Sequence, residues 1–430
     1  MSAGAAASPA SQALAIRRNP ATWLAAADVF AILTALSLPW STSLVAIFVL
    51  CWLATAAWIL DFKVYLQSLK RPICALPFAV FGLAVIGTLW SDAAWGERLY
   101  AVGPTAKLLV LPGLFYHFER SQRGMWVFAA FLASCTLLMA MSWIVAAYPE
   151  LSLRPAVLGQ NTRGIFVKNY IDQGQEFALC AVALAYPIVA YLRAGRILPA
   201  LLLGAIALSF VVNMAFVIVS RTALVTMPVL LTIFALLHLR RRSVVIVLCI
   251  MIALAGVAWM ASPYLRATAA TFLSDVQRYE ATGRATSIGT RLEVWNKSLR
   301  FISQAPIIGH GTGSTWGLFA QVAVGKPGDA SAEVFSNPHN QTLNMAIQWG
   351  VVGVVVLYAM WLSHLALFRG HGLAASIGLL VVLQNILSSL FNSHLFDFNE
   401  GWMYVLGVGV AGGMTLKAKL GEAAKQQAPP

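Results

Sequence analysis

One histidine stands in a polar segment that leads directly into a long apolar run. The segment SNPHNQTLN extends from Ser336 to Asn344 with His339 near its centre, and MAIQWGVVGVVVLYAMWL follows it. Asn337 is a favoured helix N-cap and Pro338 suits the first helical position, so we expect His339 in the first turn of a helix. The positive end of that helix would lower the pKa of the imidazole, and a neutral imidazole can accept a proton near pH 7. His339 is therefore our candidate general base, and the alternative is a capping histidine without a chemical task.

Two arginines could supply positive charge to an anionic group. In SIGTRLEVWNKSL, Thr290 and Glu293 have the spacing of a capping box, which predicts a helix that starts near Thr290 with Arg291 in its first turn. An arginine at a helix N-terminus forms an anion site. Arg221 lies in SRT, the only polar cluster of a long apolar run, and could be either an anion ligand or an interfacial anchor.

Further residues near these positions suit contacts to a sugar or a phosphate. Their side chains are basic, amide or indole groups, and they are Arg163, Lys168, Asn169, Trp295, Asn340 and Gln341. The first three lie in a polar connection at about 149–175, which would equally suit a solvated loop without a ligand. Asn340 and Gln341 directly follow the histidine.

The sequence predicts no metal site. Cys51, Cys74, Cys135, Cys180 and Cys249 each lie in an apolar run, without the spacing of a zinc site or a disulfide framework. The acidic residues expected on the same side as the histidine are scattered along the chain, at Asp92, Glu97, Glu150, Asp172, Asp397 and Glu400. A transferase that uses Mg²⁺ or Mn²⁺ would be expected to pair its carboxylates. We therefore expect arginines to neutralise the anion.

These residues must be positioned by helices that cross a membrane. Hydrophobic residues make up 59% of the chain and charged residues 10%, whereas soluble domains contain about 25% charged residues. The apolar runs are continuous and long enough to span as helices, unlike the short alternating segments of a barrel. The sequence therefore predicts an all-α polytopic membrane protein.

We expect twelve transmembrane helices, at about 22–38, 41–60, 72–91, 101–118, 124–148, 176–193, 197–219, 222–239, 243–264, 342–367, 373–391 and 401–416. The apolar run at 197–239 counts as two spans, because one helix of that length would be about twice as long as the ~30 Å hydrocarbon core is thick. We expect the run to break at its polar cluster SRT, Ser220–Thr222. Pro104, Lys107 and Pro112 interrupt the fourth span.

Basic residues predict the orientation. With a cytoplasmic N-terminus, the short inner connections carry sixteen Lys and Arg, and the short outer connections carry five, namely Arg98, Arg154, Arg163, Lys168 and Arg221. The positive-inside rule then places both termini in the cytoplasm. The predicted organisation is a cytoplasmic tail at 1–21, nine spans within 22–264, a large, partly helical outer loop at 265–341, three spans within 342–416, and a cytoplasmic tail at 417–430.

The chain resembles the O-antigen ligase and polymerase superfamily of bacterial polysaccharide enzymes. The resemblance lies in the twelve-span layout, the SRTAL turn, the stretch GTRLEVWNKSL…APIIGHGTGS and the entry PHNQTLNMAIQWGVVG, and it is most specific at 287–353. The length and the single large, late outer loop look most like the O-antigen ligase. The resemblance implies a type C-like glycosyltransferase in the bacterial inner membrane, with the active site facing the periplasm.

The resemblance also implies a reaction. O-antigen polysaccharide would move from undecaprenyl diphosphate to lipid A–core oligosaccharide with inversion, and without a metal, ATP or another cofactor. Arg221 and Arg291 would hold the departing diphosphate, and His339 would take the proton of the acceptor hydroxyl. The expected partners are these two substrates and membrane lipids, with no nucleic acid, and the oligomeric state is left open.

Two other functions stay open from the sequence. An O-antigen polymerase belongs to the same superfamily and shares this layout. A flippase or transporter of lipid-linked glycan would also use cations to hold an anionic lipid. Such a protein would be expected to show ionisable relays and broken helices in matched halves, whereas Asp28 and Lys107 are the only charges well inside the predicted spans.

Overall fold

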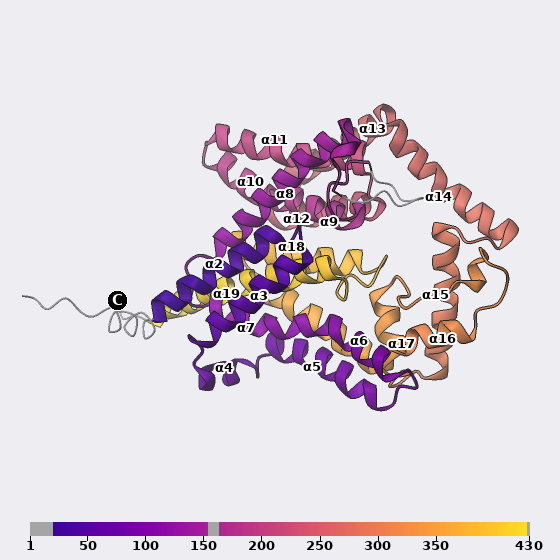
Figure 1. Ribbon diagram of the computed structural model, residues 1–430. Coiled ribbons are helices and arrows are strands. Elements are labelled where there is room, and N and C mark those ends of the chain that lie inside the picture. The colour runs from indigo at the N-terminus through magenta and orange to yellow at the C-terminus, as the bar shows by residue number, and fades with distance from the viewer. Residues whose placement is uncertain (1–19, 154–162, 428–430) are drawn as a thin grey trace, which may run out of the picture.

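The computed structural model describes residues 20–153 and 163–427, and these residues form helices and no β-strand (Figure 1). The all-α class predicted from composition is therefore observed. The predicted tail at 1–21 lies outside the described residues up to position 19, as does the 154–162 part of the polar connection.

The first part of the chain contains α2 (Pro20–Ser37), α3 (Thr42–Ala57), α4 (Phe62–Ser68), α5 (Pro72–Ile86), η1 (Gly87–Leu89), α6 (Trp95–Ala106), η2 (Lys107–Leu109), α7 (Val110–Phe118), α8 (Gly124–Ala147) and η3 (Pro149–Leu151). The remainder contains α9 (Tyr170–Ala183), α10 (Ala185–Arg193), α11 (Ile197–Asn213), η4 (Met214–Ile218), α12 (Arg221–His238), α13 (Arg241–Ala261), α14 (Pro263–Thr282), α15 (Ser287–Gln304), α16 (Ser314–Gln321), η5 (Ala330–Ala332), α17 (Gln341–Leu367), α18 (Leu373–Ser388) and α19 (Phe398–Gln427).

Within the described residues, nine helices are long and apolar enough to cross a membrane, or up to ten if α3 and α4, bent by 118°, form one broken span. This composition fits a polytopic membrane protein. Each of the twelve ranges expected from the sequence overlaps helix, but α3, α18 and α19 are not among the nine, and α3 and α18 have only 16 residues each. The number of twelve spans therefore stays a prediction.

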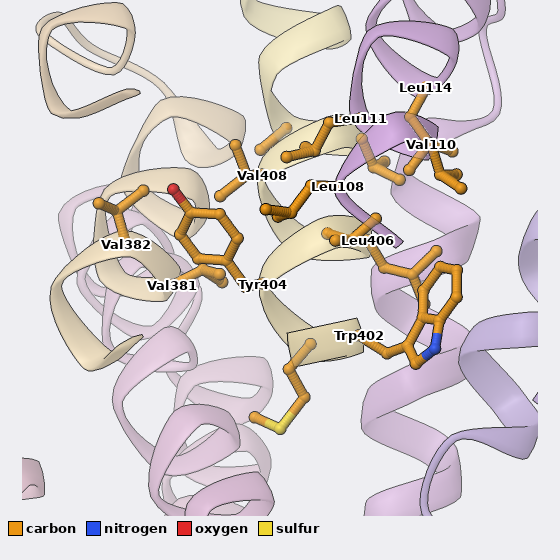
Figure 2. Packing of buried hydrophobic residues seen from close by; sticks show 14 of the residues in the cluster. Leu108, Val110, Leu111, Leu114, Val381, Val382, Trp402, Tyr404, Leu406 and Val408 are labelled. Atoms are coloured by element: carbon orange, nitrogen blue, oxygen red, sulfur yellow. The ribbon is translucent and has the colours of Figure 1, made fainter. Parts of the chain in front are cut away.

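The core is centred on α19, which packs against α7 and α18. Figure 2 shows Tyr404, Leu406 and Val408 of α19 among side chains of η2, α7 and α18. Every residue of the segment 401–413 is buried, which explains why this helix is apolar all round over that stretch. A Cβ at Gly409 would lie 2.6 Å from the Leu114 Cβ. The small glycine therefore lets α7 approach α19 closely.

The long apolar run at 197–239 is broken next to its polar cluster, Ser220–Thr222. Helix α11 ends at Asn213, the π-helical turn η4 follows, and Val219 adopts a left-handed conformation with φ 37°. Ser220 is then the N-cap residue of α12, which begins at Arg221. The break predicted at Ser220–Thr222 is confirmed.

The predicted outer loop at 265–341 is largely helical, as expected. Figure 1 shows α14 leading from the end of α13 to α15 and α16, on the side of the molecule opposite to the C-terminus. Val294 and Phe301 of α15, Phe319 of α16 and Ile347 of α17 share a small buried cluster that fastens this loop to α17. At the other end of the chain, α19 continues as a helix to Gln427, so the predicted tail at 417–430 begins inside a helix.

Candidate active site

Arg221 and Arg291 line the same cavity, which has a volume of about 420 Å³. We call it the arginine cavity. The rest of its wall is mainly apolar and comes from α12, α14, α15 and the α18–α19 connection, with Val225, Leu265, Phe272, Ile288 and Phe391 among its residues. No carboxylate of a described residue lines it. The two guanidinium groups therefore face an apolar space without an internal counter-ion.

Arg221 is placed by the break between η4 and α12. A left-handed φ is a genuine outlier for a β-branched residue, so Val219 marks a strained turn that only its surroundings can hold. The Ser262 hydroxyl at the start of α14 donates to the Ala215 carbonyl at 3.0 Å, which ties α14 to this turn. The exposed Arg221 side chain then donates from Nη2 to Thr271 Oγ1 of α14 at 3.1 Å.

Arg291 lies deeper in α15 than the sequence predicted. The N-cap is Thr286, whose hydroxyl accepts from the Gly289 N–H at 3.0 Å, so α15 starts at Ser287 and the predicted capping box at Thr290 is wrong. Burial and the nearby Arg221 lower the pKa of Arg291, while Tyr170 raises it. Among the described residues neither arginine forms an ion pair, so an anion in this cavity would relieve their repulsion.

His339 precedes helix α17 instead of lying in its first turn. The N-cap is Asn340, whose side chain accepts from the Leu343 N–H at 3.1 Å, and the predicted cap at Asn337 is wrong. Asn337 instead accepts the His339 N–H at 2.9 Å in an Asx turn, and His339 adopts a left-handed φ of 52°. Within the described residues, the only non-glycine positive φ values are at Val219 and His339, so both strained turns adjoin the candidate site.

The imidazole of His339 is half-buried and lies within the electrostatic field of Arg291. Burial lowers the pKa of His339 and Arg291 lowers it further, while the hydrogen bond to Asn392 raises it. The Nδ1 atom lies 3.1 Å from Asn392 Oδ1. The neutral imidazole expected from the sequence is thus favoured by burial and a guanidinium, not by a helix terminus.

Three predicted contact residues hold the histidine segment in place. Trp295 donates from Nε1 to the Pro338 carbonyl at 3.1 Å, and Asn340 donates from Nδ2 to the Leu390 carbonyl at 3.2 Å. Gln341 is fully buried, and its Oε1 accepts the Leu395 N–H at 3.1 Å. The structure therefore gives Trp295, Asn340 and Gln341 positioning contacts, and a direct contact of theirs with substrate stays a prediction.

Lys168 and Asn169 line a different cavity of about 310 Å³, together with the carboxylates of Asp172, Asp397 and Glu400. We call it the lysine cavity. Lys168 donates from Nζ to the Leu38 carbonyl and to Asn399 Oδ1, the latter at 2.7 Å. Asn169 caps α9 by accepting from two backbone N–H groups.

The third residue of that polar connection, Arg163, is exposed. Its guanidinium lies over the Tyr264 ring at 5.6 Å. Arg163 therefore neighbours the start of α14, whereas its predicted partners Lys168 and Asn169 face another cavity. The three residues do not form one site.

A group that was not predicted from the sequence is formed by His394, Asp397 and Glu400, whose ligand atoms lie within 4.8 Å of one another. The expectation of scattered acidic residues is wrong here, because the α18–α19 connection folds them together. Their spacing of three residues was a signal that helical geometry could have used. Burial raises the pKa of Asp397 to about 6, while burial, Arg291 and His339 lower the pKa of His394 to about 3.

An oxygen and nitrogen donor set of this kind could hold a divalent cation. However, Lys107 already lies against it. Its Nζ donates to the main-chain carbonyls of Phe396, at 3.1 Å, and of Asp397. The ammonium group therefore places a positive charge beside this group.

A third and larger cavity, of about 1080 Å³, lies beside the histidine segment. Polar and aromatic residues of α6, α16, α17 and α19 line it, among them Glu97, Tyr100, Trp316, Gln348 and Trp402. Asn337, which bonds to the His339 backbone, also lines it. The histidine segment therefore adjoins this cavity, while the His339 ring interacts with Arg291 of the arginine cavity.

Comparison with known proteins identifies the segment that carries these three side chains. Residues 205–358 match the family model described as O-antigen ligase. This segment belongs to the O-antigen ligase superfamily. It includes α12, α15 and the segment before α17, and therefore Arg221, Arg291 and His339. An uncharacterised protein of Haemophilus influenzae is 28% identical over 123 residues, which cover 27% of this chain and 31% of the relative. That match thus spans under a third of either protein.

Proposed function

We propose that this protein is an O-antigen ligase, which transfers O-antigen polysaccharide from undecaprenyl diphosphate to lipid A–core oligosaccharide. The observation that carries the proposal is the arginine cavity, in which two guanidinium groups without a carboxylate partner face an apolar space near a half-buried histidine. The superfamily match over the same helices supports the reaction class. The protein would act in the bacterial inner membrane, with both termini cytoplasmic and this cavity facing the periplasm.

The arginine cavity suits a lipid diphosphate as donor. Guanidinium groups bind phosphate oxygens with paired hydrogen bonds and keep their charge at any physiological pH. Leu265, Phe272 and Phe391 would accommodate the isoprenoid next to the diphosphate. Arg221 and Arg291 would also stabilise the negative charge that develops on the leaving diphosphate. Because two fixed cations perform this task, we propose a transfer that requires neither a metal nor ATP.

His339 would act as the general base. Its neutral imidazole would take the proton of the acceptor hydroxyl while the hydroxyl oxygen attacks the anomeric carbon from the face opposite to the diphosphate. One carbon–oxygen bond forms as the bond to the diphosphate oxygen breaks, so the configuration inverts. Undecaprenyl diphosphate leaves with the bonding electron pair, held by the arginines. The lowered pKa keeps His339 able to accept a proton near neutral pH.

The cavity of about 1080 Å³ beside the histidine segment would receive the acceptor sugar. Its exposed Tyr100 and Trp316 offer aromatic faces, and the Glu97 carboxylate offers hydrogen bonds, which together suit a sugar surface. The acceptor hydroxyl would thus approach His339 from the side away from the diphosphate. This approach is the one that an inverting displacement needs.

Purified protein, lipid-linked O-antigen and lipid A–core test the proposal directly. A ligase releases undecaprenyl diphosphate and extends the lipopolysaccharide, whereas a polymerase lengthens the glycan on its lipid carrier, and a flippase moves the lipid without changing a bond. His339→Ala should abolish ligation while the protein remains in the membrane. Full complementation of a ligase-null strain by both His339→Ala and Arg291→Ala would refute the assignment.

A further inference from the structure

Asn392, in the connection between α18 and α19, contacts the ring of His339. Its Oδ1 lies 3.1 Å from His339 Nδ1 and also accepts from Asn337 Nδ2 at 2.9 Å. Its Nδ2 donates to Asp397 Oδ2 at 2.6 Å. Each polar atom of the Asn392 amide therefore has a partner within the protein.

These contacts fix which way the Asn392 amide faces. An ionised carboxylate only accepts hydrogen bonds, so the amide nitrogen must face Asp397 and the amide oxygen must face His339. The same assignment suits Asn337, whose Nδ2 donates to Asn392 while its Oδ1 accepts from Ser393 Oγ at 2.7 Å. Reversal of the Asn392 amide would place an oxygen against the carboxylate.

An amide oxygen next to Nδ1 selects one tautomer of the imidazole. Because Asn392 Oδ1 can only accept, His339 must carry its proton on Nδ1. The lone pair of the neutral ring then lies on Nε2. The backbone of His339 is held by Asn337, which is itself bonded to Asn392, and, through the Pro338 carbonyl, by Trp295. The amide of Asn392 is the group that bonds to the ring.

We propose that Asn392 is a positioning residue, which holds the Nδ1–H tautomer of His339 and so presents Nε2 as the base. This inference rests on the proposed function of His339 and assigns Asn392 no contact with substrate. Asp397 would act on His339 only through Asn392, because its carboxylate accepts a hydrogen bond from the Asn392 amide and so orients it. Neither residue is marked by a motif in the sequence.

Charged and titratable groups on several elements would shape the pH response. Arg291 of α15 and His394 of the α18–α19 connection interact electrostatically with His339, and Asp397 reaches it through Asn392. The Asn392 bond raises the pKa of His339 and Arg291 lowers it. Removing the bond should therefore lower this pKa, whereas a carboxylate at position 392 should raise it.

The test uses full-length protein in lipid nanodiscs and compares Asn392→Ala and Asn392→Asp with the unchanged protein. Ligation kinetics give kcat and KM, and hydrogen exchange at the imidazole C2, followed by mass spectrometry, gives the protonation midpoint of His339. We expect Asn392→Ala to reduce kcat about tenfold to a hundredfold with little change in KM, because general bases contribute about 10²–10⁴ to rate. Its exchange midpoint should fall, and that of Asn392→Asp should rise.

Two internal controls distinguish a positioning role of Asn392 from a general loss of protein stability. Asn385→Ala removes a different asparagine, a buried one that accepts from Trp361 Nε1 at 3.2 Å and has no hydrogen bond to His339. It should change neither kcat nor the His339 midpoint. His371 is exposed and reports in every variant whether the exchange conditions are equal.

An unchanged kcat and midpoint in Asn392→Ala would overturn the inference. So would a lower kcat that parallels lost thermal stability while the midpoint stays in place. Failure of the proposed function has a different signature. His339→Ala would then keep its ligation activity, and the midpoint shifts in the Asn392 variants would still show that this residue bonds to the imidazole.

Discussion

The arginine cavity and the lysine cavity both contain basic residues that the sequence suggested as anion ligands, but their surroundings are opposite. Arg221 and Arg291 face an apolar wall without a carboxylate, and they repel each other. Lys168 shares its cavity with Asp172, Asp397 and Glu400 and donates to two protein oxygens. A diphosphate would be attracted to the first cavity and repelled by the carboxylates of the second.

The comparison teaches that counting basic residues does not locate an anion site. A cation can bind an external anion only when the protein has not already supplied its counter-ion and acceptors. That property depends on which other elements pack around the cation. Mutations that treat the two cavities alike should therefore have different outcomes.

Among substitutions of the basic residues in the two cavities, Arg291→Ala should have the largest effect. Removing one preorganised charge-stabilising donor typically costs about 10² to 10³ in rate, and Arg291 is partly buried and interacts with both Arg221 and His339. Ligation by purified protein measures the loss, with membrane abundance as the control. If the variant kept activity within threefold of the unchanged protein, the arginine cavity would have no part in the reaction.

Acidification should inactivate the enzyme through His339. Burial and Arg291 lower the pKa of His339 below the ordinary value, so the base stays neutral at pH 7. Below that pKa the imidazole is protonated, and the rate should fall about tenfold per pH unit. A pH–rate profile at saturating substrates measures this. A profile that instead loses activity between pH 8 and 7 would contradict a base with a lowered pKa.

Arg221→Ala should reduce ligation less than Arg291→Ala, by about tenfold to a hundredfold. Its side chain is exposed, and solvent weakens the charge that it presents. Thr271→Val, which removes the hydroxyl that Arg221 bonds to, is the milder companion change. If Arg221→Ala proved more damaging than Arg291→Ala, the exposed arginine would be the principal diphosphate ligand.

Lys168→Met should affect stability more than turnover. The substitution keeps an unbranched side chain that is one heavy atom shorter, but leaves the Leu38 carbonyl and Asn399 without their charged donor, at a loss of about 1–3 kcal/mol. Thermal unfolding in detergent measures the change, and kcat per folded molecule should stay within a few-fold. A loss of turnover as large as that of Arg291→Ala would restore Lys168 as a substrate ligand.

Asn169→Ala should give the smallest change. Asn169 accepts from the Ile171 and Asp172 N–H groups at the start of α9, and loss of a helix cap costs about 1 kcal/mol. Asn169→Ser retains a capping oxygen and should recover most of the stability. Equal destabilisation by both variants would show that the amide has a task besides capping.

Errors in the sequence analysis were local, and each has a physical cause. Thr286 and Thr290 are both good caps, and Asn337 and Asn340 both precede an apolar run, so local preference could not choose between them. The packing of α15 on α17 favours the cap at Thr286, and the left-handed turn at His339 favours the cap at Asn340. Lys168 and Arg163 lie close together in sequence, but one turns towards α19 and the other towards α14.

By itself, the sequence determined that the chain is an α-helical membrane protein and where its longest apolar run breaks, whereas its predictions of a helix that starts near Thr290 and of His339 in a helical first turn were wrong. Hydrophobicity and the positive-inside bias act along the chain, so a single sequence carries them. Only the tertiary structure decided that Arg221 and Arg291 line one cavity, that Arg291 interacts electrostatically with His339, and that Asn392 and Asp397 join the histidine through hydrogen bonds. Those contacts connect residues on different helices, and no local pattern records which helices pack together.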